Sequence, residues 1–325
     1  MNGSHLIEVE NLKVFYKFTS KGLKKEHRLV KAVNDVSFFV EKNETFGIVG
    51  ESGCGKTTTG KAVLQLVQPT GGEIRFNGKN ILDVHDKKEV FELKRSIQMI
   101  FQDPFSSLDP RYTIGRFIEE PLLVHKIGTR KEQREKTLEL MHEVGLREDQ
   151  YDRYPHELSG GQRQRAGIAR ALTLNPSVLV CDEPVSALDV SIQAQVLNMM
   201  KVLQRKYGLT YIFISHNLSV VKHISDRIGV MYLGNLVELA DADELFANPQ
   251  HPYTKALIDA IPIADPNKPP MKASLSGDVP NAIDPPSGCC FHTRCPLARP
   301  ECATMKPTLQ QTKEGHEVAC LIHAK

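Results

Sequence analysis

The sequence of 325 residues predicts an α/β fold in which a parallel-sheet core carries an antiparallel β subdomain, a helical subdomain and a C-terminal extension rich in cysteine and proline. From residue 7 to residue 40, short apolar runs alternate with polar residues, as is typical of antiparallel strands. Residues 177–181 and 210–214 are short β-rich runs, typical of strands buried on both faces of a parallel sheet. Five of the seven cysteines and ten of the nineteen prolines lie between residues 262 and 325, which marks the extension.

The predicted core begins with a strand, a loop and a helix. Residues 45–49 are a compact apolar strand, a glycine-rich loop follows, and residues 57–67 are compatible with a helix. A further strand at residues 73–77 ends in an Asn77-Gly78 turn. Residues 130–144 carry dense charge and few apolar side chains, so we expect a surface helix in the helical middle third of the chain.

Apolar spacing also predicts the second half of the core. Between the two buried strands, apolar side chains recur at three- and four-residue spacing, as on the core-facing side of a helix. They are Ile192, Val196, Met199, Met200 and Leu203. Residues 228–239 place a Gly234-Asn235 turn between two β-rich arms, which predicts a hairpin. We expect two domains, residues 1–262 and residues 263–325.

Charge and hydropathy exclude several classes of protein. The 41 Lys and Arg residues nearly balance the 39 Asp and Glu residues, for a net charge of +2, so the chain has no global attraction for nucleic acid or anionic lipid. No run of about 18 apolar residues is present, and the N-terminal residues lack the layout of a secretory signal. An odd number of cysteines suits a reducing compartment. We therefore expect a cytosolic chain that does not itself cross a membrane.

A phosphate-binding loop is predicted at residues 50–57, where GESGCGKT matches the pattern G-x-x-x-x-G-K-[ST] between a strand and a helix. Glycines let the backbone approach crowded phosphate oxygens, and successive N–H groups at the helix start supply donors. Lys56 would contact the β- and γ-phosphates, and the Thr57 hydroxyl would ligate Mg²⁺. The residues expected to bind nucleotide here are Gly50, Ser52, Gly53, Gly55, Lys56, Thr57 and Thr58.

Two adjacent carboxylates, Asp182 and Glu183, follow the buried run at residues 177–181. Such a pair at the end of a buried strand is costly without a cation, which favours a magnesium site over a solvated surface pair. Asp182 would hold Mg²⁺ through water, as the aspartate partner of a phosphate loop does. Glu183, one residue nearer the γ-phosphate, would act as a general base or orient the attacking water.

The run LSGGQ, which begins at Leu158, resembles the signature sequence of ATP-binding cassette (ABC) ATPases, and the other elements of that family appear in its order. Gln102 in MIFQDP resembles the Q-loop, residues 186–189 the D-loop, His216 the switch histidine and Tyr16 the aromatic A-loop position. The resemblance implies the fold of an ABC nucleotide-binding domain. It also implies that adenine stacks on Tyr16, that Gln102 reaches Mg²⁺ or the attacking water, and that His216 donates to the γ-phosphate.

In ABC ATPases the signature of one subunit closes over ATP held by the phosphate loop of its partner, so the resemblance implies two composite sites in a head-to-tail dimer. Ser159 and the N–H groups of Gly160 and Gly161 would form an anion-binding helix end that has no lysine of its own. The residues expected to contact nucleotide from this side are Ser159, Gly160, Gly161, Gln162 and Asp189. The resemblance covers about residues 6–262.

The C-terminal extension carries a spaced set of four cysteines, with Cys290 in addition. Four thiolates on a proline-stiffened segment can ligate a [4Fe–4S] cluster; a zinc site, with His292 or His316 as a further ligand, and unligated reduced thiols are the alternatives. The segment is similar to the C-terminal extension of ATPase subunits from bacterial oligopeptide and dipeptide importers. That resemblance leaves Cys289 and Cys290 as alternatives for the first ligand. The ligand set that it implies is Cys289, Cys295, Cys302 and Cys320.

The resemblance implies that the chain powers the import of short peptides by hydrolysing ATP, as a peripheral subunit on the cytoplasmic side of the cell membrane. Its expected partners are a second, distinct ABC ATPase subunit, two transmembrane permease subunits and an extracytoplasmic peptide-binding protein, with no nucleic acid. One alternative is an importer ATPase for another solute, such as nickel. The other is a soluble ABC ATPase acting on DNA or ribosomes, which would need coiled-coil arms or a second cassette; the sequence contains neither.

Overall fold

The computed structural model describes residues 5–19, 27–103, 108–261, 277–313 and 315–323. The chain divides into two compact units. The first comprises Met1–Val40, Thr45–Leu82 and Ser215–Lys325, and the second comprises Glu41–Glu44 and Asp83–Ile214. The domain boundary predicted after residue 262 falls outside the described residues.

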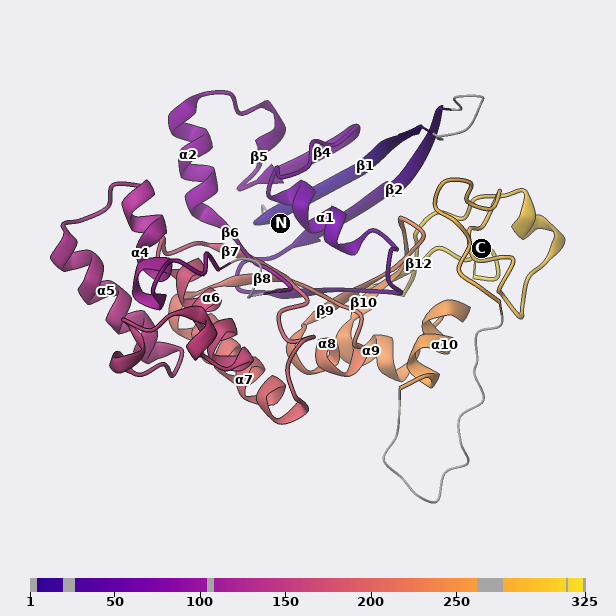
Figure 1. The fold of residues 1–325 in the computed structure, drawn as a ribbon. Coiled ribbons are helices and arrows are strands. Elements are labelled where there is room, and N and C mark those ends of the chain that lie inside the picture. The colour runs from indigo at the N-terminus through magenta and orange to yellow at the C-terminus, as the bar shows by residue number, and fades with distance from the viewer. Residues whose placement is uncertain (1–4, 20–26, 104–107, 262–276, 314, 324–325) are drawn as a thin grey trace, which may run out of the picture. The chain divides into compact units, whose positions relative to one another are not determined.

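An antiparallel sheet forms one layer of the first unit (Figure 1). Its strands are β1 (Ile7–Thr19), β2 (His27–Val40), β4 (Gly71–Phe76) and β5 (Lys79–Asn80), in the order β2-β1-β4-β5. In β1, Ile7 and Val9 are buried whereas Glu10 is exposed, because successive side chains of a strand point to opposite faces. The sheet confirms the predicted antiparallel subdomain.

A second set of strands in the first unit has the order β11-β12-β10-β9-β3. These are β3 (Thr45–Val49), β9 (Arg227–Tyr232), β10 (Asn235–Asp241), β11 (Gln310–Lys313) and β12 (His316–Val318). The strands β3 and β9 are parallel and the other pairs are antiparallel. Every residue of β3 is buried, as its continuous apolar run predicts, and β9 and β10 form the predicted hairpin.

Among the described residues, four α-helices belong to the same unit: α1 (Lys56–Val63), α8 (Leu218–Ile224), α9 (Ala242–Ala247) and α10 (Pro252–Asp259). The helix expected to continue to residue 67 ends earlier, at Val63. Gln65 has a φ of 55°, in the left-handed region, which a continuing α-helix does not allow. The prediction of this C-terminal boundary was therefore wrong by one turn.

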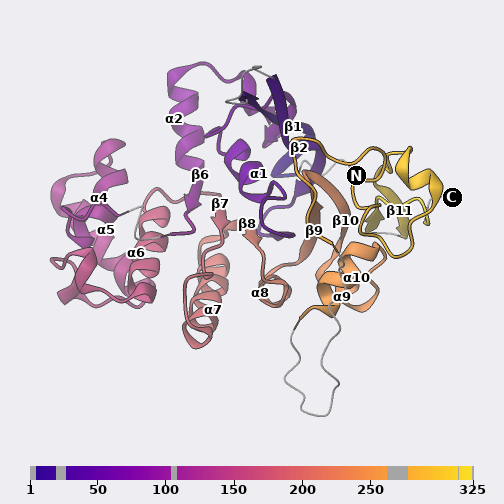
Figure 2. The same ribbon diagram turned by 45° about the vertical axis from the view of Figure 1, so that its right-hand side comes forward.

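The second unit contains a parallel sheet and a group of helices. Its strands β6 (Ile97–Ile100), β7 (Val178–Asp182) and β8 (Thr210–Ser215) have the order β8-β7-β6, and all residues of β7 and β8 are buried. The helices are α2 (Lys87–Ser96), α4 (Ile114–Val124), α5 (Arg130–Glu143), α6 (Gly160–Leu172) and α7 (Val190–Tyr207). Figures 1 and 2 show α4, α5 and α6 side by side, which confirms the predicted helical part.

The length and the apolar character of the described helices decide whether one of them could span a membrane. Within the parts of the chain that the structure describes, no helix combines the length and the apolar character needed to cross a bilayer. The longest of the helices named above, α7, has 18 residues and carries Lys201, Arg205 and Lys206.

A buried carboxylate on β10, that of Glu238, contacts the C-terminal strand β12. Glu238 is fully buried, and its carboxylate accepts hydrogen bonds from the backbone N–H groups of Gln250, at 2.6 Å, and His251, at 3.0 Å. The Nε2 atom of His316, on β12, lies 2.8 Å from the same carboxylate. Burial opposes protonation of the His316 ring, but the neighbouring carboxylates of Glu238 and Glu244 outweigh it and raise its pKa.

We expect His316→Gln to destabilise the chain by about 2 kcal/mol at pH 6, because a charge-assisted hydrogen bond to a buried carboxylate is lost. A histidine whose pKa is raised by folding adds stability below its unfolded pKa, and this contribution disappears as the pH rises through the folded pKa. The difference in unfolding free energy between wild type and variant should therefore shrink from pH 6 to pH 8.5 in urea titrations. A difference that grows over this range would contradict the assigned pair.

Candidate functional site

The predicted phosphate loop lies between β3 and α1, as its sequence context requires. Lys56 is buried, and its ammonium donates hydrogen bonds to the carbonyl oxygens of Gly50, at 2.8 Å, and Glu51, at 2.9 Å. These contacts fix a positive charge at the helix start, where backbone N–H groups also converge. The arrangement suits a phosphate group, which a lysine contacts as a point charge.

Two glycines of the loop are required for different reasons. Gly55 has a φ of 105°, and a Cβ atom there would lie 2.2 Å from the carbonyl oxygen of Ala32 on β2. Gly53 has a φ of 78°, but an added Cβ would meet no atom within 4 Å. Gly53 is therefore needed for its backbone conformation. Gly55 is also needed for close packing of the loop on β2.

Several other nucleotide-binding candidates of the first unit are accessible, whereas Gly50 is buried. Ser52 and Gly53 are exposed, and Thr57 and Thr58 are partly exposed at the start of α1. Tyr16 is 43% exposed on β1, opposite Val30 of β2, so a face of its ring is available for stacking.

The two predicted carboxylates lie at the end of β7 in the second unit. Asp182 is buried, at 4% exposure, and Glu183 is partly exposed. Glu183 has a φ of 47°, and its N–H donates to the carbonyl oxygen of Ile214 at 2.8 Å. The Nε2 atom of Gln102 donates to its carboxylate at 2.9 Å. The structure thus brings together two residues 81 positions apart that were predicted to handle the attacking water.

The signature run begins α6 and lines an open hollow of about 610 Å³. Ser159 is the N-cap of α6: its hydroxyl oxygen accepts from the N–H of Gln162 at 3.3 Å, and the Gln162 side chain accepts from the Ser159 N–H at 2.9 Å. This capping box leaves the Ser159 hydroxyl hydrogen able to donate. Asp189 and Arg165 line the same hollow. The sequence predicted no cation here, and Arg165 supplies one from the helix of the signature itself.

His216 directly follows β8 and is exposed, one residue before Asn217, which caps α8. The candidate residues fall into two groups. The phosphate loop, Tyr16 and His216 belong to the first unit, while the carboxylates, Gln102 and the signature belong to the second. Within the second unit, the structure brings Gln102 to Glu183 and Asp189 to the signature hollow.

The Cys289 thiol lies within electrostatic range of three other C-terminal thiols. Burial raises the pKa of the Cys289 thiol to about 11, and the neighbouring thiols of Cys302, Cys320 and Cys295 add to the increase. The Cys302 sulfur accepts a hydrogen bond from the N–H of Arg299 at 3.4 Å. All four are free cysteines.

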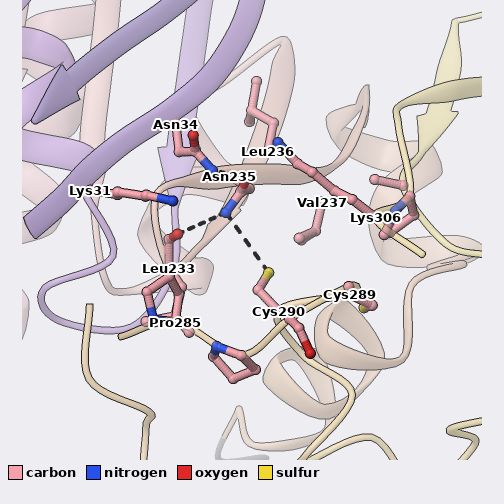
Figure 3. A pocket seen from close by; sticks show the side chains of 15 residues that line it. Lys31, Asn34, Leu233, Asn235, Leu236, Val237, Pro285, Cys289, Cys290 and Lys306 are labelled. Atoms are coloured by element: carbon pink, nitrogen blue, oxygen red, sulfur yellow. Dashed lines mark hydrogen bonds between the residues drawn. The ribbon is translucent and has the colours of Figure 1, made fainter. Parts of the chain in front are cut away.

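Cys290 points toward Asn235, as Figure 3 shows. Its sulfur accepts from the side-chain amide of Asn235 at 3.9 Å and lines a pocket of about 260 Å³. Burial raises the pKa of the Cys290 thiol to about 12, and Cys289 is the one neighbouring thiol that contributes. Among the described residues, no group of three or more Cys, His, Asp or Glu side chains is arranged so that it could hold a metal ion.

Two family models match this sequence. The model described as "ABC transporter" matches residues 33–186. The model described as "Oligopeptide/dipeptide transporter, C-terminal region" matches residues 237–302. The second match includes four of the five C-terminal cysteines, Cys289, Cys290, Cys295 and Cys302, and ends before Cys320.

Curated relatives are similar over nearly the whole chain. The oligopeptide transport ATP-binding protein AppF of Bacillus subtilis is 49% identical over 325 residues, which covers 99% of each protein. The dipeptide transport ATP-binding protein DppF of Haemophilus influenzae is 48% identical over 315 residues, covering 97% of this chain and 96% of the relative.

Solved structures share the fold of the larger part of the chain. A dimeric structure of the ATP-binding cassette MJ0796 bound to ADP and Pi has a TM-score of 0.64 at 28% identity, covering 73% of this chain and 98% of that one. The structure of cbiO1 from Clostridium perfringens, part of the ABC transporter complex cbiONQ, has a TM-score of 0.65 at 26% identity and covers 76% and 92%.

Proposed function

Since the chain belongs to the ATP-binding cassette family, and within it to the oligopeptide and dipeptide transport ATPases, we propose that it binds and hydrolyses ATP to energise peptide import. The observation that carries the choice of peptides is similarity over 99% of the chain, C-terminal region included, to a relative named for oligopeptide transport. The same similarity argues against an importer for nickel and against a soluble ABC ATPase acting on DNA or ribosomes.

In this proposal the phosphate loop holds the phosphates, and Glu183 with Gln102 activates the water that attacks the terminal one. The Lys56 ammonium contacts the β- and γ-phosphates, and His216 donates to the γ-phosphate. Glu183, with Gln102 donating to its carboxylate at 2.9 Å, takes the proton of the attacking water. Thr57 and Asp182 would hold Mg²⁺, which would neutralise charge on the phosphate oxygens.

The signature hollow supports a composite site in a dimer. Its capped helix end, the Ser159 hydroxyl and Arg165 all favour an anion. A second ATPase subunit would present its bound ATP to this hollow, and this chain's ATP would meet the signature of the partner. Hydrolysis then removes charge shared by both subunits and loosens their interface.

The proposed partners are a distinct second ATPase subunit, two transmembrane permease subunits that hold the substrate pathway, and an extracytoplasmic peptide-binding protein. The chain itself would be peripheral, on the cytoplasmic side of the cell membrane. No nucleic acid is required, which agrees with the net charge of +2.

A peptide-uptake assay tests the proposed substrate class. Deletion of the gene is expected to abolish uptake of labelled tri- or tetrapeptides, and the wild-type gene, but not one encoding Glu183→Gln, is expected to restore it. Nickel uptake in the same strains is the control. Loss of nickel uptake with intact peptide uptake would contradict the proposal, as would ATP hydrolysis that requires ribosomes or DNA.

For the C-terminal extension we propose ligation of a [4Fe–4S] cluster by Cys289, Cys295, Cys302 and Cys320. The thiols of Cys302, Cys320 and Cys295 add to the raised pKa of the Cys289 thiol, whereas the Cys290 sulfur accepts a hydrogen bond from Asn235, which supports this ligand set. Their present spacing is not that of a metal site, so ligation would have to draw them together. When bound, the cluster would stabilise a segment poor in apolar residues.

Metal analysis of anaerobically purified protein separates the three possibilities for these thiols. We expect about four iron and four sulfide per chain. Cys295→Ser is expected to lose the iron, and Cys290→Ser, the matched control, to retain it. One zinc and no sulfide would indicate the zinc alternative, and neither metal would indicate free thiols.

A further inference from the structure

Arg294 lies in the C-terminal extension, yet its guanidinium reaches the phosphate loop. Its two terminal nitrogens lie 2.8 Å and 3.1 Å from the two carboxylate oxygens of Glu51. The side chains of Arg294 and Glu51 are 6% and 24% exposed. A bidentate pair shielded from solvent in this way is both stronger and more directional than a surface ion pair.

An aromatic cluster holds Arg294 in place. A terminal nitrogen of Arg294 donates to the Tyr232 hydroxyl at 3.4 Å. Phe291, three residues earlier, is fully buried, with its ring centroid 5.2 Å from that of Tyr232 and 5.4 Å from that of Tyr253. The arginine therefore projects from a segment that is itself anchored in the core of the first unit.

Glu51 is held at every polar group that it has. Arg294 binds its carboxylate, its backbone N–H donates to the Tyr253 hydroxyl at 2.9 Å, and its carbonyl oxygen accepts from the Lys56 ammonium at 2.9 Å. Lys56 is the residue expected to contact the phosphates. The conformation of Glu51 is thus coupled directly to the position of the phosphate-binding charge.

The sign of the charge matters as much as the geometry. Glu51 places a carboxylate in a loop that must receive a triphosphate, and the two would repel one another. The guanidinium of Arg294 compensates this charge while it orients the loop. We propose that Arg294 is a positioning residue for the phosphate loop, through which the C-terminal extension sets the affinity of the loop for nucleotide.

This inference rests on the proposed function, because it takes the loop to be the ATP site. Removal of the guanidinium would leave Glu51 uncompensated beside the phosphates. Nucleotide affinity should fall, while the cleavage step, which depends on groups elsewhere, should change little. The expected signature is therefore a change in KM with nearly constant kcat.

The experiment measures equilibrium binding of a fluorescent ATP analogue, steady-state ATPase kinetics and nucleotide-free thermal unfolding for full-length variants. The variants are Arg294→Met, Arg294→Lys, Glu51→Gln and the double variant Arg294→Met/Glu51→Gln. Arg28→Met is the matched control. Arg28 also pairs with the extension, 2.7 Å from Asp284, but these two side chains are 47% and 71% exposed.

Arg294→Met is expected to raise Kd and KM about tenfold and to leave kcat within about twofold. Arg294→Lys keeps the positive charge but loses the two parallel hydrogen bonds of the guanidinium. Its Kd should therefore lie between those of wild type and Arg294→Met. Adding Glu51→Gln to Arg294→Met should restore Kd to within about threefold of wild type, because the repelling charge is gone. A general loss of structure would show no such rescue.

Three results would overturn the inference: wild-type affinity in Arg294→Met, a loss that Glu51→Gln does not relieve, or an equal loss in Arg28→Met. Failure of the proposed function looks different. In that case wild type itself would not bind the ATP analogue, and no variant could be ranked against it.

Discussion

Glu183→Gln is expected to bind ATP with unchanged affinity and to hydrolyse it about 1,000-fold more slowly than wild type. Glutamine has the size of glutamate, and its amide can still interact with Gln102, which lies 2.9 Å from the Glu183 carboxylate. An amide cannot accept the proton of the attacking water. Phosphate release under saturating ATP and equilibrium binding of the analogue measure the two quantities separately.

The same variant tests whether two subunits share the nucleotide. With hydrolysis blocked, ATP should hold this chain and the second ATPase subunit together, and light scattering of their mixture should report a dimer with ATP and monomers with ADP. Glu139→Gln is the matched control, because Glu139 is an exposed residue of the same unit paired with Lys136. Undiminished turnover in Glu183→Gln would refute the assigned base. An ATP-bound dimer with Ser159 remote from every triphosphate would refute the composite site.

Local patterns predicted most of the fold. The apolar runs of β3, β7 and β8 correspond to strands whose residues are all buried, and the alternating residues 7–40 became β1 and β2. The continuous apolar runs predict β3, β7 and β8 well because every residue of these three strands is buried.

The strands of the extension were missed for a physical reason. β11 has four residues and β12 has three, and Val318 is the one apolar residue among these seven. Their stability depends on pairing with β10 and on the buried contact between Glu238 and His316, residues 78 positions apart. A short window of sequence cannot contain both residues of that contact, so local patterns do not predict these strands.

Some residues of the candidate site could also be predicted from local sequence, and others could not. The loop glycines, Lys56 and the carboxylates belong to contiguous motifs, so their identity could be predicted. Arg294 is separated from Glu51 by 243 positions, and no local pattern distinguishes it from a surface arginine. The choice between Cys289 and Cys290 as the first cluster ligand is likewise open in the sequence, because the two adjacent residues carry the same thiol.

Lys56→Met should cause the largest loss of nucleotide affinity among the loop variants, about 100-fold. A charge-assisted hydrogen bond contributes about 1.5–3 kcal/mol, and the ammonium is expected to contact two phosphates, so the loss of about two such bonds reaches this magnitude. The carbonyl oxygens of Gly50 and Glu51 would also lose the donor that now lies 2.8 Å and 2.9 Å away. Titration with the fluorescent analogue measures the affinity.

Lys61→Met is the control, because Lys61 lies on the same helix, in its last turn, and carries the same charge. If the phosphates responded to the overall positive charge of α1, the two variants would lose similar affinity. If they respond to an ammonium fixed at the helix start, Lys61→Met should bind nearly as wild type does. Retained affinity in Lys56→Met would contradict the assignment of the loop, and with it the ATP site on which the coupling through Glu51 depends.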